Sequence, residues 1–450
     1  MIKIIVSNKV YLKPPEELTK ILERNYVFEI YEHHSQKYPK IVRQINRISE
    51  EVYCIERGSL EFIVEWLTNN GYEFTIVDRT VECPVDIPKP SFTLREDQQQ
   101  VYDEFTNSAI INAQGGWGKS IAALSLVYKM QRKTLIVCTT TAIRSMWIDE
   151  ITKWFGFTPG VIGSGKFNIE PPICVGNIQS VQKYSRELSK EFGFIILDEM
   201  HHCPASTFLS VLTNSFAGIR LGLSGTLKRK DQLHIVFPGL FGSKIFIPSV
   251  NNTVNPTIIR IKSEVELSGN PSVPWANKIT AIYADPRHGL LVASILNILE
   301  NNNYKILVTS DRVEFSNLLH SHSEKSALFT SETSLENRDQ ALKDVYADKI
   351  NKLYATTSIF SEGISCNPLS ALLHTSSTNN ESLLYQLVWR IMRIHKGKNP
   401  PVVIDICFEG ALGKKHAKER KALYQVKGWD VIDVELHDLD SVLNILLQET

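Results

Sequence analysis

The sequence predicts an α/β fold in which two tandem parallel-sheet domains follow a small α+β domain. Two sets of short apolar runs alternate with helix-like stretches, as buried parallel strands alternate with their connecting helices. A glycine-rich run at residues 113–120 lies between one such strand and a helix. Pro84, Pro88 and Pro90 separate these sets from the N-terminal residues. The predicted parts are an accessory domain, a first α/β domain, a hinge and a second α/β domain, at residues 1–88, 89–250, 251–285 and 286–450.

The composition is that of a multidomain protein without a membrane or secretory segment. A chain of 450 residues exceeds what one hydrophobic core usually supports. Lysine plus arginine and aspartate plus glutamate both number 49, so a polyanion partner would need local basic patches. The seven cysteines show no C-x-x-C spacing and predict buried thiols instead of a disulfide framework. With no long apolar span and no leader at Met1, we expect a cytoplasmic protein without a membrane partner.

Short apolar runs of β type define the strands of all three domains. In the accessory domain we expect strands at Ile2–Val6, Tyr26–Tyr31, Glu51–Ile55 and Glu73–Asp78. In the first α/β domain we expect them at Ala109–Ile111, Thr134–Cys138, Ile173–Val175, Phe194–Leu197 and Arg220–Leu223. A passage rich in proline and asparagine, residues 251–274, indicates the hinge. In the second α/β domain we expect strands at Lys305–Thr309, Lys352–Ala355, Ala371–His374 and Val402–Ile406.

The glycine-rich run that ends at Ser120 has the residues and the position of a phosphate-binding loop. The backbone N–H groups of Gly115, Gly116 and Gly118 can turn toward phosphate oxygens, and the following helix N-terminus adds positive potential. Lys119 is expected to reach the β- and γ-phosphates, and the Ser120 hydroxyl to bind Mg²⁺. These residues predict binding of a nucleoside triphosphate. A turn that merely joins a strand to a helix is the alternative.

Two acids directly follow the apolar strand Phe194–Leu197. In a phosphate-loop enzyme, an aspartate at a strand end completes the Mg²⁺ shell, while a neighbouring glutamate orients and deprotonates the attacking water. We therefore assign Asp198 to the metal and Glu199 to the water. A helix N-cap is one alternative. Two histidines and a cysteine nearby suggest a zinc site as another, but a second pair of ligands at metal spacing is missing.

From Leu94 to about Lys398 the chain resembles the superfamily 2 DExH-box helicases and translocases, with an XPB-like continuation of the DExH box. The segments that carry the resemblance are Leu94-Arg95-Glu96-Asp97-Gln98, Asp198-Glu199-Met200-His201, Leu223-Ser224-Gly225-Thr226, Thr357–Ile364 and Gln386–Arg393. The resemblance implies two RecA-like domains that bind and hydrolyse ATP with Mg²⁺. It implies nucleotide contacts for Arg95, Gln98 and Gln386. It implies coupling of hydrolysis to movement for His201, Ser224, Thr226 and Gly363.

The last of these segments, Gln386–Arg393, contains two arginines, Arg390 and Arg393, whose i, i+3 spacing would place both on one face of a helix. Both guanidinium groups could then point at a γ-phosphate held by the other domain. An arginine delivered in this way typically accelerates hydrolysis by about 10³–10⁵. Domain closure would therefore gate hydrolysis. A solvated basic helix face is the alternative for an isolated pair, but the order of the preceding motifs favours the catalytic role.

Nucleic-acid contacts in this family come mostly from loops on one face of both domains and go to phosphates, with little sequence preference. By resemblance, this track comprises Thr139, Thr140, Gln179, Ser180 and Thr357. Neutral donors suit a translocating motor because they release each phosphate more easily than charged donors do. For each of these residues, the alternative is an ordinary helix N-cap at a strand end. Trp117 and Trp389 depart from the family pattern, and we expect them to pack on neighbouring surface or to stack on a base.

Within the superfamily, the chain most resembles UvsW-type phage helicases, which remodel branched DNA. The resemblance implies a 3′→5′ DNA helicase of forks and four-way junctions in the host cytoplasm, with recombination or replication proteins as partners. Residues 40–48 predict an amphipathic helix that presents Lys40, Arg43 and Arg47 to duplex DNA; a solvated outer face is the alternative. An RNA helicase and a nucleotide-gated DNA-binding module without net unwinding are the remaining alternatives.

Overall fold

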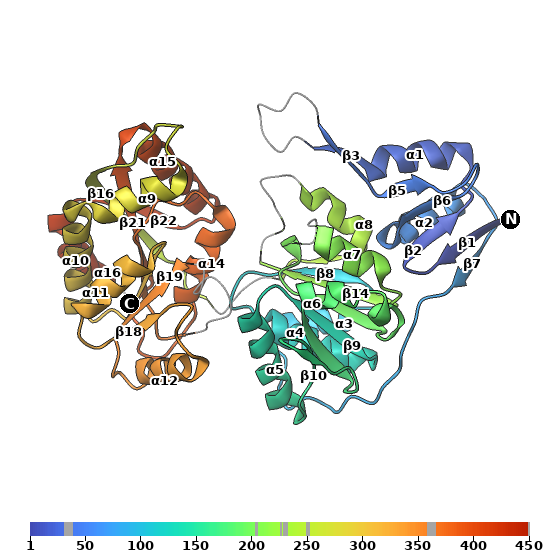
Figure 1. Cartoon of the computed structure of the whole chain (residues 1–450), viewed down its shortest axis with the longest axis horizontal. Helices are drawn as coiled ribbons and strands as arrows, with labels where there is room; N and C mark the ends of the chain where they lie inside the picture. The colour runs from blue at the N-terminus through green and yellow to red at the C-terminus, as the bar shows by residue number, and fades with distance from the viewer. Residues whose placement is uncertain are drawn as a thin grey trace. The chain divides into compact units, whose positions relative to one another are not determined.

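The structure, a computed structural model, describes residues 1–30, 39–202, 206–225, 227, 233–248, 253–357 and 366–448. The chain separates into two compact units, Met1–Val250 (unit 1) and Asn251–Thr450 (unit 2), which Figure 1 shows in blue to green and in yellow to red. Unit 1 contains the accessory domain and the first parallel sheet, and unit 2 contains the second parallel sheet. Within the described part, no helix has the length and apolar character needed to cross a membrane.

The accessory domain is built on a five-stranded mixed sheet in the order β5-β6-β2-β1-β7. Its strands are β1 Ile2–Val6, β2 Lys9–Leu12, β5 Ile45–Arg47, β6 Tyr53–Glu56 and β7 Phe74–Asp78. Its other elements are α1 Glu16–Tyr26, α2 Leu60–Asn69 and a hairpin of β3 Val27–Ile30 with β4 Lys40–Arg43. Leu18 and Leu22 lie one turn apart on α1, and both are buried in the core of this domain.

Residues 40–43 and 45–47 form strands, so the helix expected over residues 40–48 is wrong. β-Branched side chains are frequent here, and such side chains fit a pleated surface better than a helix. Ile45 pairs with Ile55 and is buried, whereas Ile41 and Ile48 are each 54% exposed. The three isoleucines therefore do not share one buried face.

The first parallel sheet has eight strands in the order β11-β10-β12-β9-β13-β14-β8-β15, and only β10 and β11 pair antiparallel. Its strands are β8 Ala109–Asn112, β9 Thr134–Cys138, β10 Gly160–Gly163, β11 Lys166–Phe167, β12 Ile173–Asn177, β13 Phe194–Leu197, β14 Ile219–Ser224 and β15 Ile245–Phe246. Its helices are α3 Glu96–Glu104, α4 Lys119–Met130, α5 Thr141–Phe155, α6 Ile178–Lys183, α7 Ser206–Asn214 and α8 Phe237–Phe241. Two separate hydrophobic cores show that α3 to α5 cover one face and α6 to α8 the other.

Unit 2 contains a seven-stranded, all-parallel sheet in the order β18-β19-β17-β20-β21-β16-β22. Its strands are β16 Thr257–Glu266, β17 Ile306–Ser310, β18 Ser326–Phe329, β19 Lys352–Thr356, β20 Ala371–His374, β21 Val402–Glu409 and β22 Asp430–Val434. Its helices are α9 Trp275–Ala284, α10 Pro286–Asn301, α11 Val313–Ser321, α12 Leu335–Tyr346, α14 Glu381–Ile391, α15 Gly410–Val426 and α16 Leu439–Gln448. Helices α9, α10, α11 and α16 cover one face, and α12, α14 and α15 the other.

Much of the expected hinge, residues 251–285, belongs to the folded core of unit 2, so that assignment was too broad. Strand β16 lies between β21 and β22, and its residues Ile258 and Ile259 are fully buried. Helix α9 then covers residues 275–284. The prolines and asparagines that suggested a hinge lie on both sides of β16 and leave its apolar run uninterrupted. A composition signal therefore located the two ends of a strand instead of a flexible connection.

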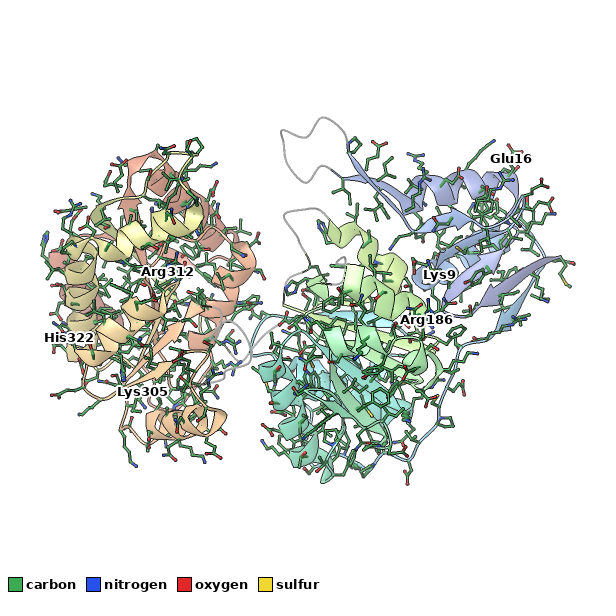
Figure 2. The ribbon with its side chains drawn as sticks, viewed as in Figure 1. Lys9, Glu16, Arg186, Lys305, Arg312 and His322 are labelled. Atoms are coloured by element: carbon green, nitrogen blue, oxygen red, sulfur yellow. The ribbon has the colours of Figure 1, made fainter. Side chains whose placement is uncertain are left out.

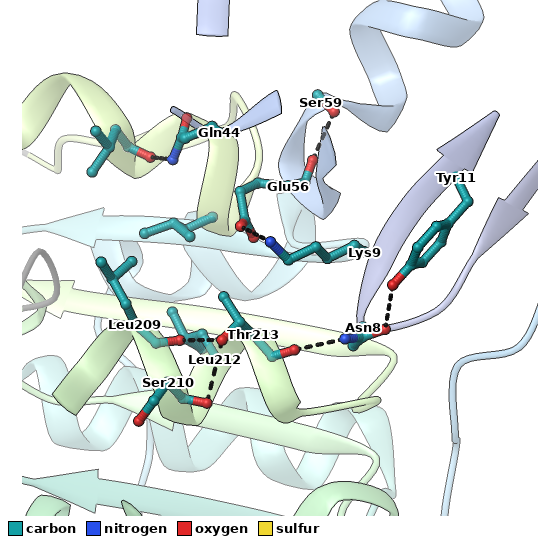
Figure 3. A network of polar contacts seen from close by, with 12 residues as sticks. Asn8, Lys9, Tyr11, Gln44, Glu56, Ser59, Leu209, Ser210, Leu212 and Thr213 are labelled. Atoms are coloured by element: carbon teal, nitrogen blue, oxygen red, sulfur yellow. Dashed lines mark hydrogen bonds and ion pairs between the residues drawn. The ribbon is translucent and has the colours of Figure 1, made fainter. Parts of the chain in front are cut away.

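A fully buried arginine, Arg220 of β14, joins the accessory domain to the first parallel sheet inside unit 1. Its guanidinium donates to the carbonyl oxygens of Asn8 at 2.9 Å, Leu212 at 2.9 Å, Ser215 at 3.1 Å and Leu240 at 3.3 Å. In the same region the Asn8 amide donates to the Thr213 carbonyl at 2.7 Å, and Figure 3 shows this bond beside the contact of Tyr11 with Asn8. The accessory domain and the domain of the first parallel sheet are thus connected through backbone carbonyls from both domains.

Two glycines allow the backbones to approach closely at this junction. A Cβ atom on Gly58 would lie 2.0 Å from the carbonyl oxygen of Pro238 at the start of α8. A Cβ atom on Gly239 would lie 2.2 Å from the side-chain oxygen of Gln44. Beside them, Arg57 is buried next to Arg220, and burial followed by that neighbouring charge lowers the pKa of Arg57. The junction is therefore tightly packed and contains two buried cations.

We expect Arg220→Met to destabilise unit 1 by about 3–5 kcal/mol, because the change removes a charged donor from the carbonyl oxygens of four residues. Thermal melting and limited proteolysis measure the effect, and cleavage should begin in the accessory domain. Arg186→Met is the matched control because Arg186 is exposed, and it should change stability by about 0.5 kcal/mol or less. An Arg220→Met protein that melts like the wild type would contradict the structural role of this side chain.

Candidate functional site

Four adjacent strands of the first parallel sheet end at the same edge and bring the expected site residues together. The strands β9, β13, β14 and β8 are neighbours and run parallel. The residues that end or follow them include Thr139 after β9, Asp198 after β13, Ser224 at the end of β14 and the phosphate loop after β8. Because the carboxyl ends of parallel strands meet at one edge, residues distant in sequence share one site.

The phosphate loop has the backbone geometry that its glycines predicted. Gly116 and Gly118 have φ of 89° and 91°, a region that favours glycine, and α4 begins at Lys119. The Lys119 ammonium folds back on the loop and donates to the carbonyl oxygens of Ala113 at 2.7 Å and Gln114 at 3.5 Å. Phosphate oxygens are stronger acceptors than these carbonyls and can replace them. Gly115 lies in the same turn, and Ser120 is the second residue of α4.

The segment ahead of the loop is bound to it through Trp117. This indole is fully buried and donates to Asp97 Oδ2 at 2.6 Å, so Trp117 packs in the core and does not stack on a base. The carbonyl oxygen of Trp117 accepts from Arg95 at 2.6 Å and from Gln98 at 3.0 Å. The Gln98 side chain is buried and bound to the loop backbone, and a Cβ on Gly118 would lie 2.6 Å from its amide nitrogen.

Asp198 is a buried carboxylate with too little positive charge around it. Its Oδ2 accepts from the Trp147 indole at 2.8 Å, and its Oδ1 accepts from the Glu199 backbone N–H at 2.9 Å. Burial, followed by the neighbouring charge of Glu199, raises the pKa of Asp198 to about 6, although Lys119 and the Trp147 hydrogen bond oppose the rise. A cation at this position would stabilise the ionised form.

Glu199 has a backbone φ of 51°, in the left-handed region that is unfavourable for residues with a side chain. Such a conformation typically costs about 1–3 kcal/mol and is common at functional sites. The Nδ1 atom of His201 lies 3.3 Å from Glu199 Oε2 and 3.3 Å from Ser224 Oγ. The structure thus brings together Glu199, His201 and Ser224, whereas Thr226 lies outside the described residues.

The site suits a magnesium ion that is shared with phosphates. Among the described residues, no three His, Cys, Asp or Glu side chains converge to form a protein-only metal cage. Mg²⁺ needs few protein ligands when substrate phosphates supply others. The under-neutralised Asp198 carboxylate offers one ligand, and Ser120, a hydroxyl at the start of α4, could offer the second.

The expected nucleic-acid residues of unit 1 follow the next strands along the same edge. Thr140 Oγ1 accepts the Ile143 N–H at 3.3 Å, so this residue is the N-cap of α5. The Thr139 hydroxyl is buried and has no hydrogen-bond partner among the residues that the structure describes. Gln179 is exposed and Ser180 is partly exposed at the start of α6, which follows β12. In the accessory domain, Arg43 and Arg47 are exposed, and the Lys40 side chain lies outside the described part.

In unit 2 the two expected finger arginines do not lie on one helix. Helix α14 contains Gln386 and Arg390 but ends at Ile391, and Arg393 instead forms an isolated bridge with Thr253. The expectation of a shared helix face is therefore wrong. The reason is that a backbone N–H from outside the helix, that of Val254, binds the Met392 carbonyl. Arg390 is partly exposed, while Arg393 is largely buried and lies 3.5 Å from Asn367 Oδ1.

Thr357 is buried, and its hydroxyl donates to Asp311 Oδ1 at 2.7 Å, which limits its direct access to nucleic acid. Ser376 donates to the other carboxylate oxygen of Asp311 at 2.7 Å. The next residue, Arg312, which Figure 2 labels, donates to the Ala276 carbonyl of α9 at 2.6 Å. Gly363, the expected coupling residue that follows, lies outside the described residues.

Sequence reasoning missed three residues that hold the site in place. Asp97 binds the Trp117 indole, Trp147 binds Asp198, and Asp311 binds Thr357. Asp97 lies within the family segment that ends at Gln98, so its position next to Gln98 could have marked it as a site residue. Trp147 looked like an ordinary apolar residue of α5, and no pattern marked its indole nitrogen. Trp389 is also buried and stacks on Tyr385 with 5.9 Å between ring centroids, as expected for packing.

We expect Asp198→Asn to stabilise the nucleotide-free, magnesium-free protein at pH 8 by about 1–3 kcal/mol. The folded pKa of about 6 lies above the ordinary 3.8, so the folded state binds this proton more tightly and loses stability as pH rises from about 4 to 6. Thermal melts at pH 4 and pH 8 measure the gain, which should shrink at pH 4. Asp86→Asn, at an exposed aspartate, is the control. A pH-independent difference would contradict this assignment.

Comparison with known proteins identifies two families in the chain. Residues 91–229 match the family described as type III restriction enzyme, res subunit. Residues 290–395 match the helicase conserved C-terminal domain family. The first match covers the phosphate loop and the two acids, and the second match covers Arg390 and Arg393.

The similar proteins are helicases and translocases. Probable helicase D10 of Escherichia phage T5 is 44% identical over 435 residues, which is 96% of this chain and 96% of that protein. DNA 3′-5′ translocase XPB2 of Sulfurisphaera tokodaii is 32% identical over 182 residues, 40% of this chain and 41% of that protein. The solved structure of S. cerevisiae Dbp5 bound to RNA and ADP BeF3 matches with a TM-score of 0.56 at 12% identity, over 78% of this chain and 93% of that chain, which shows the fold alone.

The fold and the site agree with these likenesses. Two parallel-sheet units confirm the predicted pair of RecA-like domains, and the first contains a phosphate loop beside a strand-end aspartate and glutamate. The likeness to the phage T5 protein extends over nearly the whole of both chains. The chain belongs to the superfamily 2 helicases and is an ATP-driven helicase of the phage type.

Proposed function

We propose that this helicase translocates 3′→5′ along DNA and unwinds or branch-migrates forked and four-way-junction DNA. The observation that carries the proposal is the row of side chains along the carboxyl edge of the first parallel sheet. Ionic groups follow β8 and β13, and neutral hydroxyls and amides follow β9 and β12. One end of the row suits a triphosphate, and the other suits a chain of phosphates that must be released at each step. The Sulfurisphaera tokodaii relative, named a DNA 3′-5′ translocase, supports DNA as the substrate and this direction of movement.

For hydrolysis, we assign phosphate binding to Lys119 and the loop N–H groups, and Mg²⁺ binding to Ser120 and Asp198. When Mg²⁺ is bound, it neutralises the negative charge that develops on the phosphates. Glu199 accepts the proton of the attacking water. We assign nucleotide contacts to Arg95, Gln98 and Gln386, and we propose that Gln98 acts by holding the loop backbone in place. Arg390 and Arg393 supply positive charge to the γ-phosphate from unit 2.

The histidine of the DExH box offers a physical route from hydrolysis to movement. The Nδ1 atom of His201 lies 3.3 Å from both Glu199 and Ser224, and one N–H at that atom can be shared between them. When Glu199 takes up a proton, its attraction for this N–H falls and the ring turns toward Ser224. Ser224 ends β14, the strand whose Arg220 contacts the accessory domain. We propose that Thr226 and Gly363 extend this coupling.

We expect Lys119→Ala to lower nucleic-acid-stimulated ATP hydrolysis and unwinding by about 100-fold or more, because the phosphates lose their main cation. Glu199→Gln should retain ATP binding and lose turnover to a similar extent, because the amide cannot accept a proton. Steady-state ATPase and fluorescent-nucleotide binding measure the two effects separately. Lys153→Ala, at an exposed lysine of α5, is the control and should leave both unchanged. Normal hydrolysis in either site variant would refute these roles.

The neutral row after β9 and β12 supports tracking along a phosphate backbone. Thr139, Thr140, Gln179 and Ser180 offer hydroxyls and an amide without a fixed charge. We propose that they contact successive phosphates of one strand, and that Thr357 contributes from unit 2 when its bond to Asp311 opens. Each such contact is sequence-independent, which suits a motor that passes over any sequence. ATPase stimulation by single-stranded DNA, duplex, junction and RNA distinguishes the DNA helicase from an RNA helicase.

The accessory domain supports junction binding through exposed arginines beside the first parallel sheet. Arg43 ends the hairpin strand β4, and Arg47 ends β5. We propose that Lys40, Arg43 and Arg47 contact the phosphates of a duplex arm. Removal of the whole domain does not test this idea cleanly, because it would take Asn8 from the buried Arg220 and expose the core of the first sheet.

We expect the double variant Arg43→Gln/Arg47→Gln to weaken binding to four-way junctions and to reduce the slope of log K against log salt by about 2, since two phosphate contacts are lost. ATPase stimulated by short single strands should be unchanged. Fluorescence anisotropy over a salt series measures the slope. Arg24→Gln, at an exposed arginine of α1, is the control. An unaltered salt slope would exclude these two arginines from the junction interface.

A further inference from the structure

The turn that carries Arg393 has its backbone fixed at three successive carbonyl groups. Lys398 Nζ donates to the Ile391 carbonyl oxygen at 2.6 Å and to the Arg393 carbonyl oxygen at 2.7 Å. The Val254 N–H donates to the Met392 carbonyl oxygen, between these two, at 2.8 Å. The last carbonyls of a helix ordinarily lack intrahelical partners, and here they are bound from two sides.

Lys398 is placed where a lysine is electrostatically unfavourable. Its side chain is largely buried, and burial followed by the nearby charge of Arg393 lowers the pKa of Lys398 to about 7. Among the described residues, no acidic side chain pairs with it. Burying an amine beside an arginine without a counter-ion costs free energy, which other interactions must offset. The two short hydrogen bonds to the turn offset this cost, because an amine offers several donors from one atom and can bind two carbonyl groups at once.

We propose that Lys398 is a positioning residue for Arg393: it fixes the backbone on both sides of Met392 so that the arginine is presented in one place. This inference rests on the proposed function of Arg393 in ATP hydrolysis. Lys398 itself touches only the turn and acts through Arg393. Arg393 lies two residues beyond the end of α14, and the Lys398 ammonium binds the carbonyl oxygens on both sides of Met392, those of Ile391 and Arg393.

The first described residues of unit 2 also bind this turn. Thr253 and Val254 are the first described residues of unit 2, and they bind the turn at Arg393 and Met392. Lys398 binds the same turn through the flanking carbonyls. The arginine is therefore held between the start of unit 2 and a side chain from the loop beyond it. A displaced guanidinium would cost rate without costing nucleotide affinity, because a misplacement of about 1 Å can lower a rate by about 100-fold.

The test is a double-mutant cycle on nucleic-acid-stimulated ATPase with the full-length protein. We expect Lys398→Met to lower kcat about tenfold while KM for ATP changes less than about twofold. In the Arg393→Ala background, Lys398→Met should lower kcat by less than about twofold further, because both changes remove the same contribution. A full additional loss in that background, or a wild-type kcat for folded Lys398→Met, would overturn the proposal.

Matched controls separate this proposal from the proposed role of Arg393 and from misfolding. Lys396→Met, at an exposed lysine of the same turn, should behave as wild type. If Arg393→Ala leaves kcat unchanged, the catalytic role of Arg393 fails; if it lowers kcat and folded Lys398→Met does not, only the role of Lys398 fails. Should Lys398→Met melt below the assay temperature, Lys398→Gln, which keeps one donor group, decides: an intermediate kcat supports the proposal and a wild-type kcat overturns it.

Discussion

The parallel register of β9, β13, β14 and β8 is the constraint on which the catalytic site depends. Because these strands end at one edge, a lysine, two acids, a histidine and a serine meet there although they are far apart in sequence. This convergence crowds negative charge in a buried place, and Asp198 has a pKa of about 6 as a result. The site is thus electrostatically incomplete without a cation, and its chemistry follows from the sheet that supports it.

The parts of the chain that a local pattern determines could be predicted from the sequence. The strands β8, β9, β12, β13 and β14 of the first sheet and β17, β19, β20 and β21 of the second are short apolar runs, so their positions followed from the local sequence, and the phosphate loop followed from its glycines. The other strands of the two sheets were not anticipated. The segment at residues 40–48 could not be predicted in the same way. Its isoleucines also satisfy a helical period, and only pairing with β6 decides for a strand. Pairing depends on residues distant in sequence, which a local period does not contain.

The errors in unit 2 have the same origin. Strand β16 was taken for a hinge because prolines and asparagines surround it, yet its position between β21 and β22 is a property of the whole sheet. The end of α14 at Ile391 depends on Val254, which lies far away in the sequence and binds the following carbonyl. Trp117 and Trp147 likewise acquired their roles from partners in other elements. Residue types identified the chemistry of the site, and contacts between residues distant in sequence determined where each side chain lies and which partner it binds.

The two glycines at the junction within unit 1 have a consequence for the ancestry and the engineering of this chain. Gly58 belongs to the accessory domain and Gly239 to α8, and each leaves room for an atom of the opposite side. A foreign N-terminal domain with any larger residue at the first position would collide with the α8 backbone. Related genes can therefore exchange this accessory domain only if the α8 side of the junction is exchanged together with it.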